Sequence, residues 1–174
     1  KYVVFYGRIG EEKGVRILMQ IWEQIKDIPL VVMGSGPLEK EFKLWAEKKD
    51  HVYFLGYIEH NKCLSIVKGG EFVIFPSIWY EGCSMVEIET ESLGNALIAT
   101  KLGFSVEAIE DGVNGYKVEL GDVDGFVECI RKLWKNPDDC QKLGENARKD
   151  YEAKYLPEDN YKQLMKIYRD TIKG

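Results

Sequence analysis

Two basic residues, Arg8 and Lys13, lie in a glycine-containing segment that follows the first apolar run of the chain. The segment reads Gly7-Arg8-Ile9-Gly10-Glu11-Glu12-Lys13-Gly14 and comes just before a helix-compatible stretch. Phosphate groups bind where cationic side chains meet the free backbone N–H groups of a helix N-terminus. The segment therefore predicts an anion site, although a solvated loop in which Lys13 pairs with a nearby glutamate explains the same residues equally well.

Two acidic residues, Glu81 and Glu89, flank the start of a helix predicted from Ser84 to Leu93. Eight residues of helix would separate them by ~12 Å along the axis. Paired carboxylates that act as acid and base on one glycosidic bond lie ~5 to 9.5 Å apart, so this spacing favours contacts with two parts of one extended ligand. The alternative is that Glu87, Glu89 and Glu91 are an acidic surface of the helix.

Three further segments offer backbone groups to a ligand. Gly34-Ser35-Gly36-Pro37 allows a close backbone approach but also fits a tight turn. Gly56-Tyr57-Ile58 follows an apolar run and could line a base pocket, and core packing explains it equally well. The N–H groups around Cys83 to Met85 would face an anion at the start of the predicted helix.

A metal site is not expected. Asp122-Val123-Asp124 has the Asp-x-Asp pattern but precedes a helix, where aspartate is a favoured N-cap. The cysteines show no metal-ligand spacing and are expected to be reduced thiols of a cytosolic protein; they are Cys63, Cys83, Cys129 and Cys140. His51 and His60 are expected to be surface or loop residues.

The elements that must position these residues alternate between apolar runs and amphipathic stretches. Strands are predicted at Tyr2–Tyr6, Leu30–Met33, Val52–Leu55, Phe72–Phe75, Leu97–Ala99 and Gly115–Val118. Continuous apolar strands separated by helices predict a doubly wound α/β fold with a Rossmann-like parallel sheet. Ligands of such sheets bind beyond the carboxyl ends of the strands, which is where the segments above lie.

After Val118 the pattern predicts helices only, namely Val123–Lys135, Pro137–Lys154 and Glu158–Ile172, as a C-terminal helical appendix. In the last of them an apolar stripe recurs at helical spacing; it could pack back on this domain or on a part of the protein outside this chain, and core packing is the expected role. Its residues are Tyr161, Leu164, Tyr168 and Ile172.

Composition narrows the function further. The 174 residues carry a net charge of -5, which argues against nucleic-acid binding because such proteins concentrate lysine and arginine. No apolar run reaches the ~20 residues of a membrane span, and no signal peptide is seen. The chain starts inside an apolar run at Lys1, so we expect one soluble domain cut from a longer protein.

Taken in order, these segments resemble the C-terminal domain of group 1 glycosyltransferases, which are two-domain enzymes of the GT-B fold. The match covers about residues 3 to 150 and rests on Gly7-Arg8, Glu12-Lys13-Gly14, Gly34-Ser35-Gly36-Pro37, Phe54-Leu55-Gly56, Pro76-Ser77, Glu81 spaced to Glu89, and Glu110-Asp111-Gly112-Val113-Asn114-Gly115. The ordered series is far more specific than any one of its members.

The resemblance implies a retaining transfer without a protein nucleophile, a metal or another cofactor. Arg8 and Lys13 would neutralise the departing diphosphate, Glu81 would contact the hexose, and Glu89 would bind the ribose hydroxyls. The implied donor site comprises Gly7, Gly34, Gly36, Tyr57, Ile58, Glu81, Gly82, Cys83, Ser84, Met85, Val86 and Glu89, with Arg8, Lys13 and Glu81 as the catalytic residues.

The resemblance also implies partners that the chain itself does not contain. Residues 1–174 would be the nucleotide-sugar-binding half, and the N-terminal acceptor domain would be missing. A mannosyl donor such as GDP-mannose, and a glycan or lipid-linked acceptor, fit the general resemblance. The expected location is the cytoplasm, or the cytoplasmic face of the membrane through the rest of the protein.

Several residues depart from the family pattern. Cys83-Ser84 replaces Phe-Gly, Glu87 replaces an apolar residue, and Thr90-Glu91-Ser92 replaces Ala-Met-Ala, which predicts a modified sugar pocket. A non-catalytic nucleotide-binding or signalling module remains an alternative, but a receiver-like domain needs clustered acids where Gly7 and Arg8 stand. The half of a sugar-nucleotide epimerase is a second alternative.

Overall fold

The computed structural model describes residues 1–173, which form a six-stranded parallel sheet flanked by helices. The strands are β1 (Val3–Tyr6), β2 (Leu30–Met33), β3 (Val52–Gly56), β4 (Phe72–Phe75), β5 (Ala96–Thr100) and β6 (Gly115–Val118). Their order in the sheet is β3-β2-β1-β4-β5-β6, and every neighbouring pair is parallel. The predicted doubly wound fold is confirmed, with strand ends within one residue of the prediction.

The central strands are buried along their whole length, as their apolar runs predict. Every residue of β1, β4 and β5 is buried, because helices cover both faces of a parallel sheet. The chain winds from β1 out to β3, then returns to pair β4 with β1, with Val3 opposite Phe72. The carboxyl ends of β1 and β4 therefore mark the point where the winding reverses.

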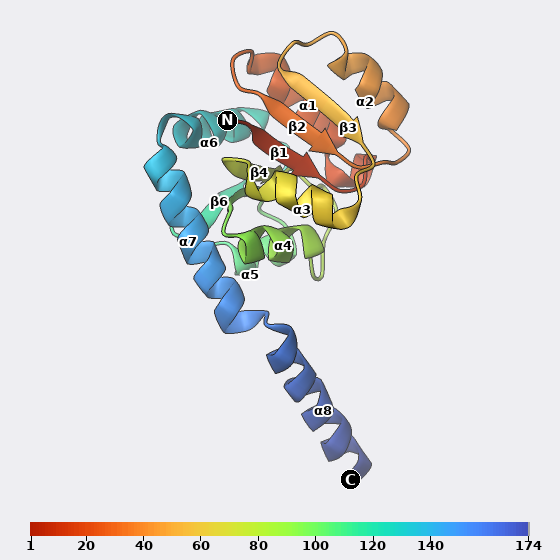
Figure 1. The fold of residues 1–174 in the computed structure, drawn as a ribbon, viewed down its shortest axis with the longest axis vertical. Coiled ribbons are helices and arrows are strands. Elements are labelled where there is room, and N and C mark those ends of the chain that lie inside the picture. The colour runs from red at the N-terminus through yellow and green to blue at the C-terminus, as the bar shows by residue number, and fades with distance from the viewer. Residues whose placement is uncertain (174) are drawn as a thin grey trace.

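Helices lie on both faces of the sheet (Figure 1). They are η1 (Glu11–Lys13, 3-10), α1 (Val15–Gln24), α2 (Glu39–Ala46), α3 (His60–Lys68), α4 (Met85–Leu93), α5 (Phe104–Ala108), α6 (Val123–Lys135), α7 (Pro137–Lys154) and α8 (Pro157–Lys173). The buried side chains of α1, α2 and α6 share one core with one face of the sheet. Val67 of α3, with the partly buried Val86 and Leu93 of α4, packs on the opposite face.

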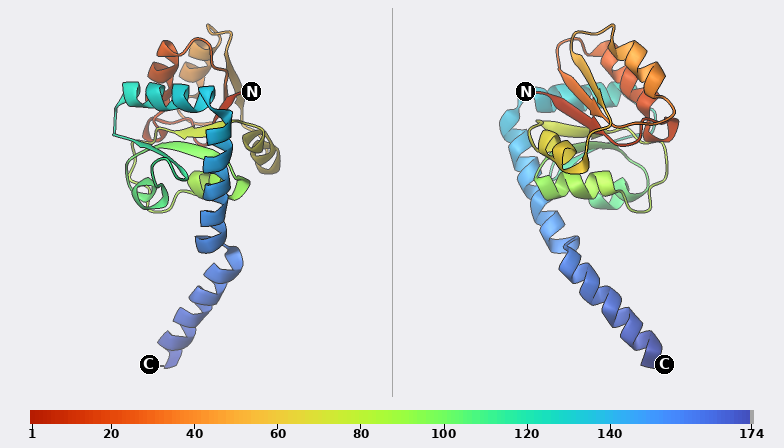
Figure 2. Two further views of the ribbon diagram at one scale, coloured as in Figure 1. Left: turned by 90° about the vertical axis from the view of Figure 1, so that its left-hand side faces the viewer. Right: turned by 45° about the vertical axis from the view of Figure 1, so that its right-hand side comes forward.

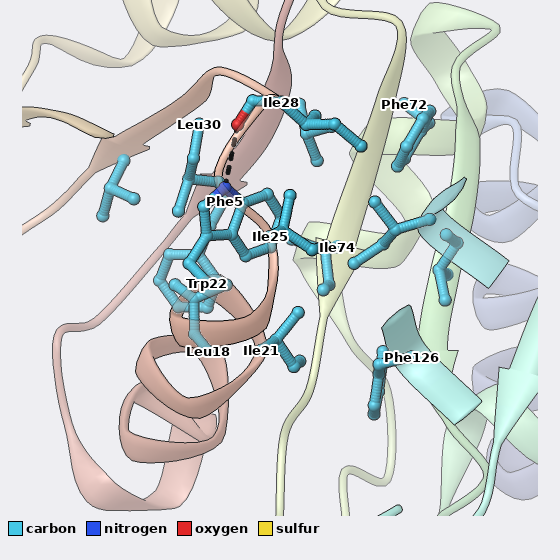
Figure 3. Close-up of a cluster of buried hydrophobic side chains, with 14 of the residues drawn as sticks. Phe5, Leu18, Ile21, Trp22, Ile25, Ile28, Leu30, Phe72, Ile74 and Phe126 are labelled. Atoms are coloured by element: carbon cyan, nitrogen blue, oxygen red, sulfur yellow. Dashed lines mark hydrogen bonds between the residues drawn. The ribbon is translucent and has the colours of Figure 1, made fainter. Parts of the chain in front are cut away.

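The larger core is built around Trp22 of α1, which is fully buried (Figure 3). Its indole Nε1 donates a hydrogen bond to the Ile28 carbonyl oxygen at 3.1 Å, so the one polar atom of the ring is satisfied. Phe5 of β1 and Phe126 of α6 belong to the same cluster. This packing fixes α1, and with it the loop that precedes α1.

The Asp-x-Asp segment caps a helix, as predicted. Asp122 is the N-cap of α6, and its side chain accepts a hydrogen bond from the Gly125 N–H at 2.9 Å.

The last helix does not pack as predicted. α8 projects away from the sheet in every view (Figures 1 and 2), and the side chains of its predicted stripe are exposed, from 41% for Leu164 to 85% for Ile172. The expected core packing of Tyr161, Leu164, Tyr168 and Ile172 is therefore wrong within this chain. Pro157 starts α8 in a new direction after α7 ends, and this direction carries the stripe past the domain.

Among residues 1–173, no helix is both long enough and apolar enough to cross a membrane.

Candidate functional site

A pocket of about 420 Å³ opens at the carboxyl ends of β1, β2 and β3, beside the point where the winding reverses. The ends of these strands, the loops that follow them and the first turns of α3 and α4 form its walls. The lining residues are Tyr6, Gly7, Arg8, Met33, Gly34, Ser35, Tyr57, Ile58, His60, Cys63, Met85, Val86 and Glu89. The structure thus brings together residues from four separate predicted segments.

Two glycines cross in the floor of this pocket. Gly7 and Gly34 have φ of +131° and +140°, and a Cβ atom on Gly34 would overlap the Gly7 carbonyl oxygen. The Gly7 N–H donates to the Met33 carbonyl at 3.0 Å, and the Gly34 N–H donates to the Gly56 carbonyl at 2.8 Å. The loops after β1, β2 and β3 therefore meet backbone to backbone, and side chains at these positions would force them apart.

Glu89 stands in the pocket wall on α4, close to His60 of α3. The nearest oxygen and nitrogen of the two side chains, Glu89 Oε1 and His60 Nε2, lie 3.6 Å apart. Burial raises the pKa of Glu89, and the charge of His60 opposes that rise. His60 is exposed, as expected. It is also the first residue of α3 and lines the pocket, which was not predicted.

Tyr6 forms part of the pocket wall from the end of β1. Its hydroxyl donates to the Val86 carbonyl at 2.8 Å, and burial raises the pKa of the phenol well above its usual value. The phenol is therefore neutral, and its hydrogen bond connects the end of β1 to the first turn of α4.

Arg8 offers a positive charge at the pocket. Its Nε lies 3.1 Å from Glu12 Oε1, in an ion pair between an exposed arginine and a half-buried glutamate at the surface. Surface pairs of this kind are weak, typically about 0–1 kcal/mol, so an anion can compete with Glu12 for the guanidinium.

Lys13 and Glu81 form a second ion pair, which joins the loop before α1 to the loop before α4. The Lys13 ammonium donates to Glu81 Oε1, and both side chains are mostly buried. The approach of the two loops depends on Gly14, where a Cβ atom would overlap the Pro76 carbonyl oxygen. The partner of Lys13 is thus Glu81, 68 residues away, and not its neighbours Glu11 and Glu12. Neither Lys13 nor Glu81 belongs to the walls of the pocket described above.

Four other predicted site residues also lie outside the pocket walls. Gly36 packs against the loop after β1, since a Cβ atom there would lie 2.5 Å from the Ile9 carbonyl oxygen. Ser84 is buried, and its hydroxyl caps α4 by accepting from the Glu87 N–H at 3.4 Å. Gly82 and Cys83 lie between the Lys13–Glu81 pair and this cap, and Cys83 is exposed. Their assignment to a donor site stays a prediction.

The interpretation of Glu87 and Glu91 as an acidic helix surface is wrong, because both face the interior. Glu87 is fully buried; its Oε1 accepts from Ser105 Oγ at 3.0 Å, while its Oε2 has no partner. Burial raises the pKa of Glu87 to about 7 and that of Glu91 to about 8. Burial is the largest cause in each case, and for Glu91 the charge of Asp150 adds to it.

Four lining residues lie outside the predicted site segments: Tyr6, Met33, His60 and Cys63. Ser35 lies inside the predicted glycine segment but was not itself among the predicted site residues. Tyr6 and Met33 are the last residues of their strands, so the rule that ligands bind at carboxyl ends could have found them. His60 and Cys63 lie one helical turn apart on α3, whose orientation only the tertiary fold defines.

Within residues 1–173, no group of three or more His, Cys, Asp or Glu side chains is placed to hold a metal ion.

Comparison with known proteins connects this site to a family. The family model for glycosyl transferases of group 1 matches residues 1–150. The O-antigen chain mannosyltransferase C of Escherichia coli is 26% identical over 99% of this chain and 47% of its own length. The alpha-D-kanosaminyltransferase of Streptomyces kanamyceticus is 29% identical over 97% of this chain and 45% of its own length. The chain therefore spans about half the length of these curated relatives.

Solved structures show the same fold. HepE of Anabaena, crystallised in complex with UDP, superimposes with a TM-score of 0.88 at 19% identity, over 98% of this chain and 49% of its own. The C-terminal domain of the group 1 protein LpcC from Francisella tularensis gives a TM-score of 0.78 at 24% identity, over 90% of this chain and 87% of its own. The fold is that of the C-terminal half of the GT-B architecture.

Proposed function

Because the chain belongs to the glycosyl transferases of group 1, we propose that residues 1–174 are the nucleotide-sugar-binding domain of a retaining glycosyltransferase. The N-terminal acceptor domain would lie in a part of the protein outside this chain. One observation carries the proposal: a single pocket at the reversal of the sheet combines the crossed glycines Gly7 and Gly34, the cation Arg8 and the acid Glu89. A ligand with an anionic middle and hydroxyl groups matches that set.

The donor would lie along the carboxyl edge of the sheet. Tyr57 and Ile58 would border the nucleoside, and Glu89, held beside His60, would accept hydrogen bonds from the ribose hydroxyls. Arg8 and Lys13 would approach the diphosphate, with help from free N–H groups at the start of α4. Glu81, paired with Lys13, would contact the hexose.

The reaction needs no nucleophile from the protein. The acceptor hydroxyl oxygen would bond to the anomeric carbon on the face from which the diphosphate departs. As the bond from that carbon to the phosphate oxygen breaks, the phosphate oxygen takes the hydroxyl proton. Negative charge grows on the leaving diphosphate, so Arg8 and Lys13 stabilise the transition state more than the bound donor.

The donor we favour is GDP-mannose. The mannosyltransferase among the relatives supports a mannosyl donor, whereas the kanosaminyltransferase and the UDP complex of HepE show that other sugars and nucleotides occur on this fold. The acceptor would be a glycan or a lipid-linked glycan, and the four unpaired cysteines fit work in the cytoplasm or at its membrane face.

Calorimetry on the 174-residue chain tests the proposal directly. We expect one nucleoside diphosphate among GDP, UDP and ADP, or its sugar conjugate, to bind in a 1:1 ratio, and Arg8→Ala to weaken it about tenfold. Arg131→Ala, which removes a half-buried arginine of α6 paired with Asp27 away from the pocket, is the matched control and should leave binding unchanged. If none of these nucleotides binds to the wild-type chain, the proposed donor site is wrong.

A further inference from the structure

Three apolar residues, Ile78 to Tyr80, stand exposed immediately before Glu81. Trp79 is 62% exposed and Tyr80 is 73% exposed, although large aromatic side chains are normally at least partly covered. We call Ile78 to Tyr80 the aromatic segment. It lies in the loop between β4 and α4.

The backbone around the aromatic segment is fixed on both sides. On one side, the Ile78 N–H donates to the Glu12 carbonyl at 3.0 Å, and Ser77 Oγ donates to the same oxygen at 3.0 Å. On the other side, the Phe104 N–H donates to the Glu81 carbonyl at 2.8 Å. The exposed rings therefore stand on a braced loop, and a ligand that stacks on them does not have to order the backbone first.

We propose that Trp79 and Tyr80 form a stacking platform for a pyranose ring of the acceptor. The proposal rests on the proposed function, because it uses Glu81 as the position of the transferred hexose. The faces of aromatic rings are electron-rich and attract the weakly positive C–H groups on one face of a pyranose. An acceptor ring held next to Glu81 would place its hydroxyl group near the reacting carbon.

Other occupants fit the aromatic segment less well. A loop that binds anionic lipids needs neighbouring lysine or arginine that is free to meet the headgroups. Residues 76–84 contain neither, the chain has a net charge of -5, and Lys13, which reaches this loop, is mostly buried in its pair with Glu81. A single sugar ring is small enough to stack on one or two exposed aromatic side chains, and Trp79 and Tyr80 are consecutive in the chain.

Saturation-transfer NMR on the 174-residue chain tests the platform with methyl α-pyranosides of mannose, glucose and galactose as probes. We expect ring C–H protons of at least one probe to receive saturation from the wild-type chain. The signal should fall at least fivefold in Trp79→Ala/Tyr80→Ala, persist in Trp79→Phe/Tyr80→Phe, and stay unchanged in Tyr161→Ala, which removes an exposed tyrosine of α8. No transfer to any probe, or equal transfer to the alanine variant, overturns the proposal.

Calorimetry with the nucleotides separates this proposal from the donor site. Nucleotide binding by Trp79→Ala/Tyr80→Ala should equal that of the wild-type chain, and a saturating nucleotide sugar should leave the methyl pyranoside bound. Displacement of the probe by the nucleotide sugar would assign the rings to the donor hexose and overturn the acceptor assignment. If the wild-type chain binds no nucleotide but still transfers saturation to a pyranoside, the result counts against the donor site alone.

Discussion

A carboxyl group without access to water is more stable as the neutral acid, and α4 carries two such groups, Glu87 and Glu91. They occupy positions where the family pattern has apolar residues. The spacing of the glutamates in residues 87–91 did not predict their burial. They are buried because α4 packs against α3, α7 and β5, which leaves the helix little free surface. Which residues of such a helix face the interior depends on its neighbours and not on its own periodicity.

The buried acids predict a fall in stability as the pH rises. The pKa of Glu87 is about 7 in the folded chain, against an ordinary value of 4.5, so the folded state holds the proton more tightly. Ionisation of Glu87 therefore lowers the free energy of unfolding as the pH rises. The loss begins at about pH 4.5, grows up to about pH 7 and is constant above, where it is on the order of 3 kcal/mol. We expect the free energy of unfolding of Glu87→Gln, relative to that of the wild type, to be about 2 kcal/mol higher at pH 8 than at pH 5. Urea unfolding at the two pH values measures this difference.

The matched control for this prediction is Glu128→Gln, which changes an exposed glutamate of α6. Its stability relative to the wild type should be the same at both pH values. A Glu87→Gln variant whose relative stability is also independent of pH would show that the carboxyl is not neutral in the fold.

Glu81 is expected to act on the transferred sugar rather than on the nucleotide. In the full-length enzyme, Glu81→Gln should lower kcat at least a hundredfold and change the affinity for the nucleoside diphosphate by less than threefold. Steady-state kinetics and calorimetry on the same variant measure the two effects. Equal losses in both would reassign Glu81 to positioning Lys13, its ion-pair partner.

At the scale of the elements, the loops after β1 and β2 depend on glycines that carry no chemistry. Gly34→Ala would place a methyl group on the Gly7 carbonyl oxygen, at a φ that side chains rarely adopt. We expect it to destabilise the chain by about 3 kcal/mol or more and to abolish nucleotide binding. Gly56→Ala is the matched control: φ is also positive, but no atom lies within 4 Å of the new methyl, so about 1 kcal/mol is expected. Similar losses in the two variants would contradict the crossed-loop geometry.

A feature can be predicted from the sequence when residues close together in the chain determine it. The central strands were predictable because a strand buried on both faces consists of apolar residues, as Phe72 to Phe75 does. The edge strands β3 and β6 carry exposed or half-buried residues, and their short apolar or β-branched runs were still enough to predict them. The pocket was predictable in part, because Gly7 and Gly34 follow strand ends and Glu89 lies one turn into the helix that follows β4. The pairing of Lys13 with Glu81 was not, because it depends on the packing of Gly14 against Pro76, which no local pattern encodes.

At the scale of the whole molecule, α8 is a helix whose apolar stripe is not covered by any other part of residues 1–173. Tyr161, Leu164 and Tyr168 repeat at helical spacing and are each more than 40% exposed. Proteins rarely leave such a stripe in water, and the chain spans only about half the length of its relatives. We therefore expect the acceptor domain to cover α8 in the full-length protein.

This arrangement predicts that a change on α8 has different effects in the two contexts. In the 174-residue chain, Leu164→Glu/Tyr168→Glu should leave the thermal midpoint and nucleotide binding of the domain unchanged, because α8 packs on none of its core. In the full-length protein the same change should lower the free energy of unfolding by about 2–4 kcal/mol, because two apolar side chains that the acceptor domain buries would be replaced by charged ones. Gln163→Glu, which adds a charge beside the stripe, should have little effect in either. If the double variant melts like the wild type in the full-length protein, the stripe is not buried by the acceptor domain.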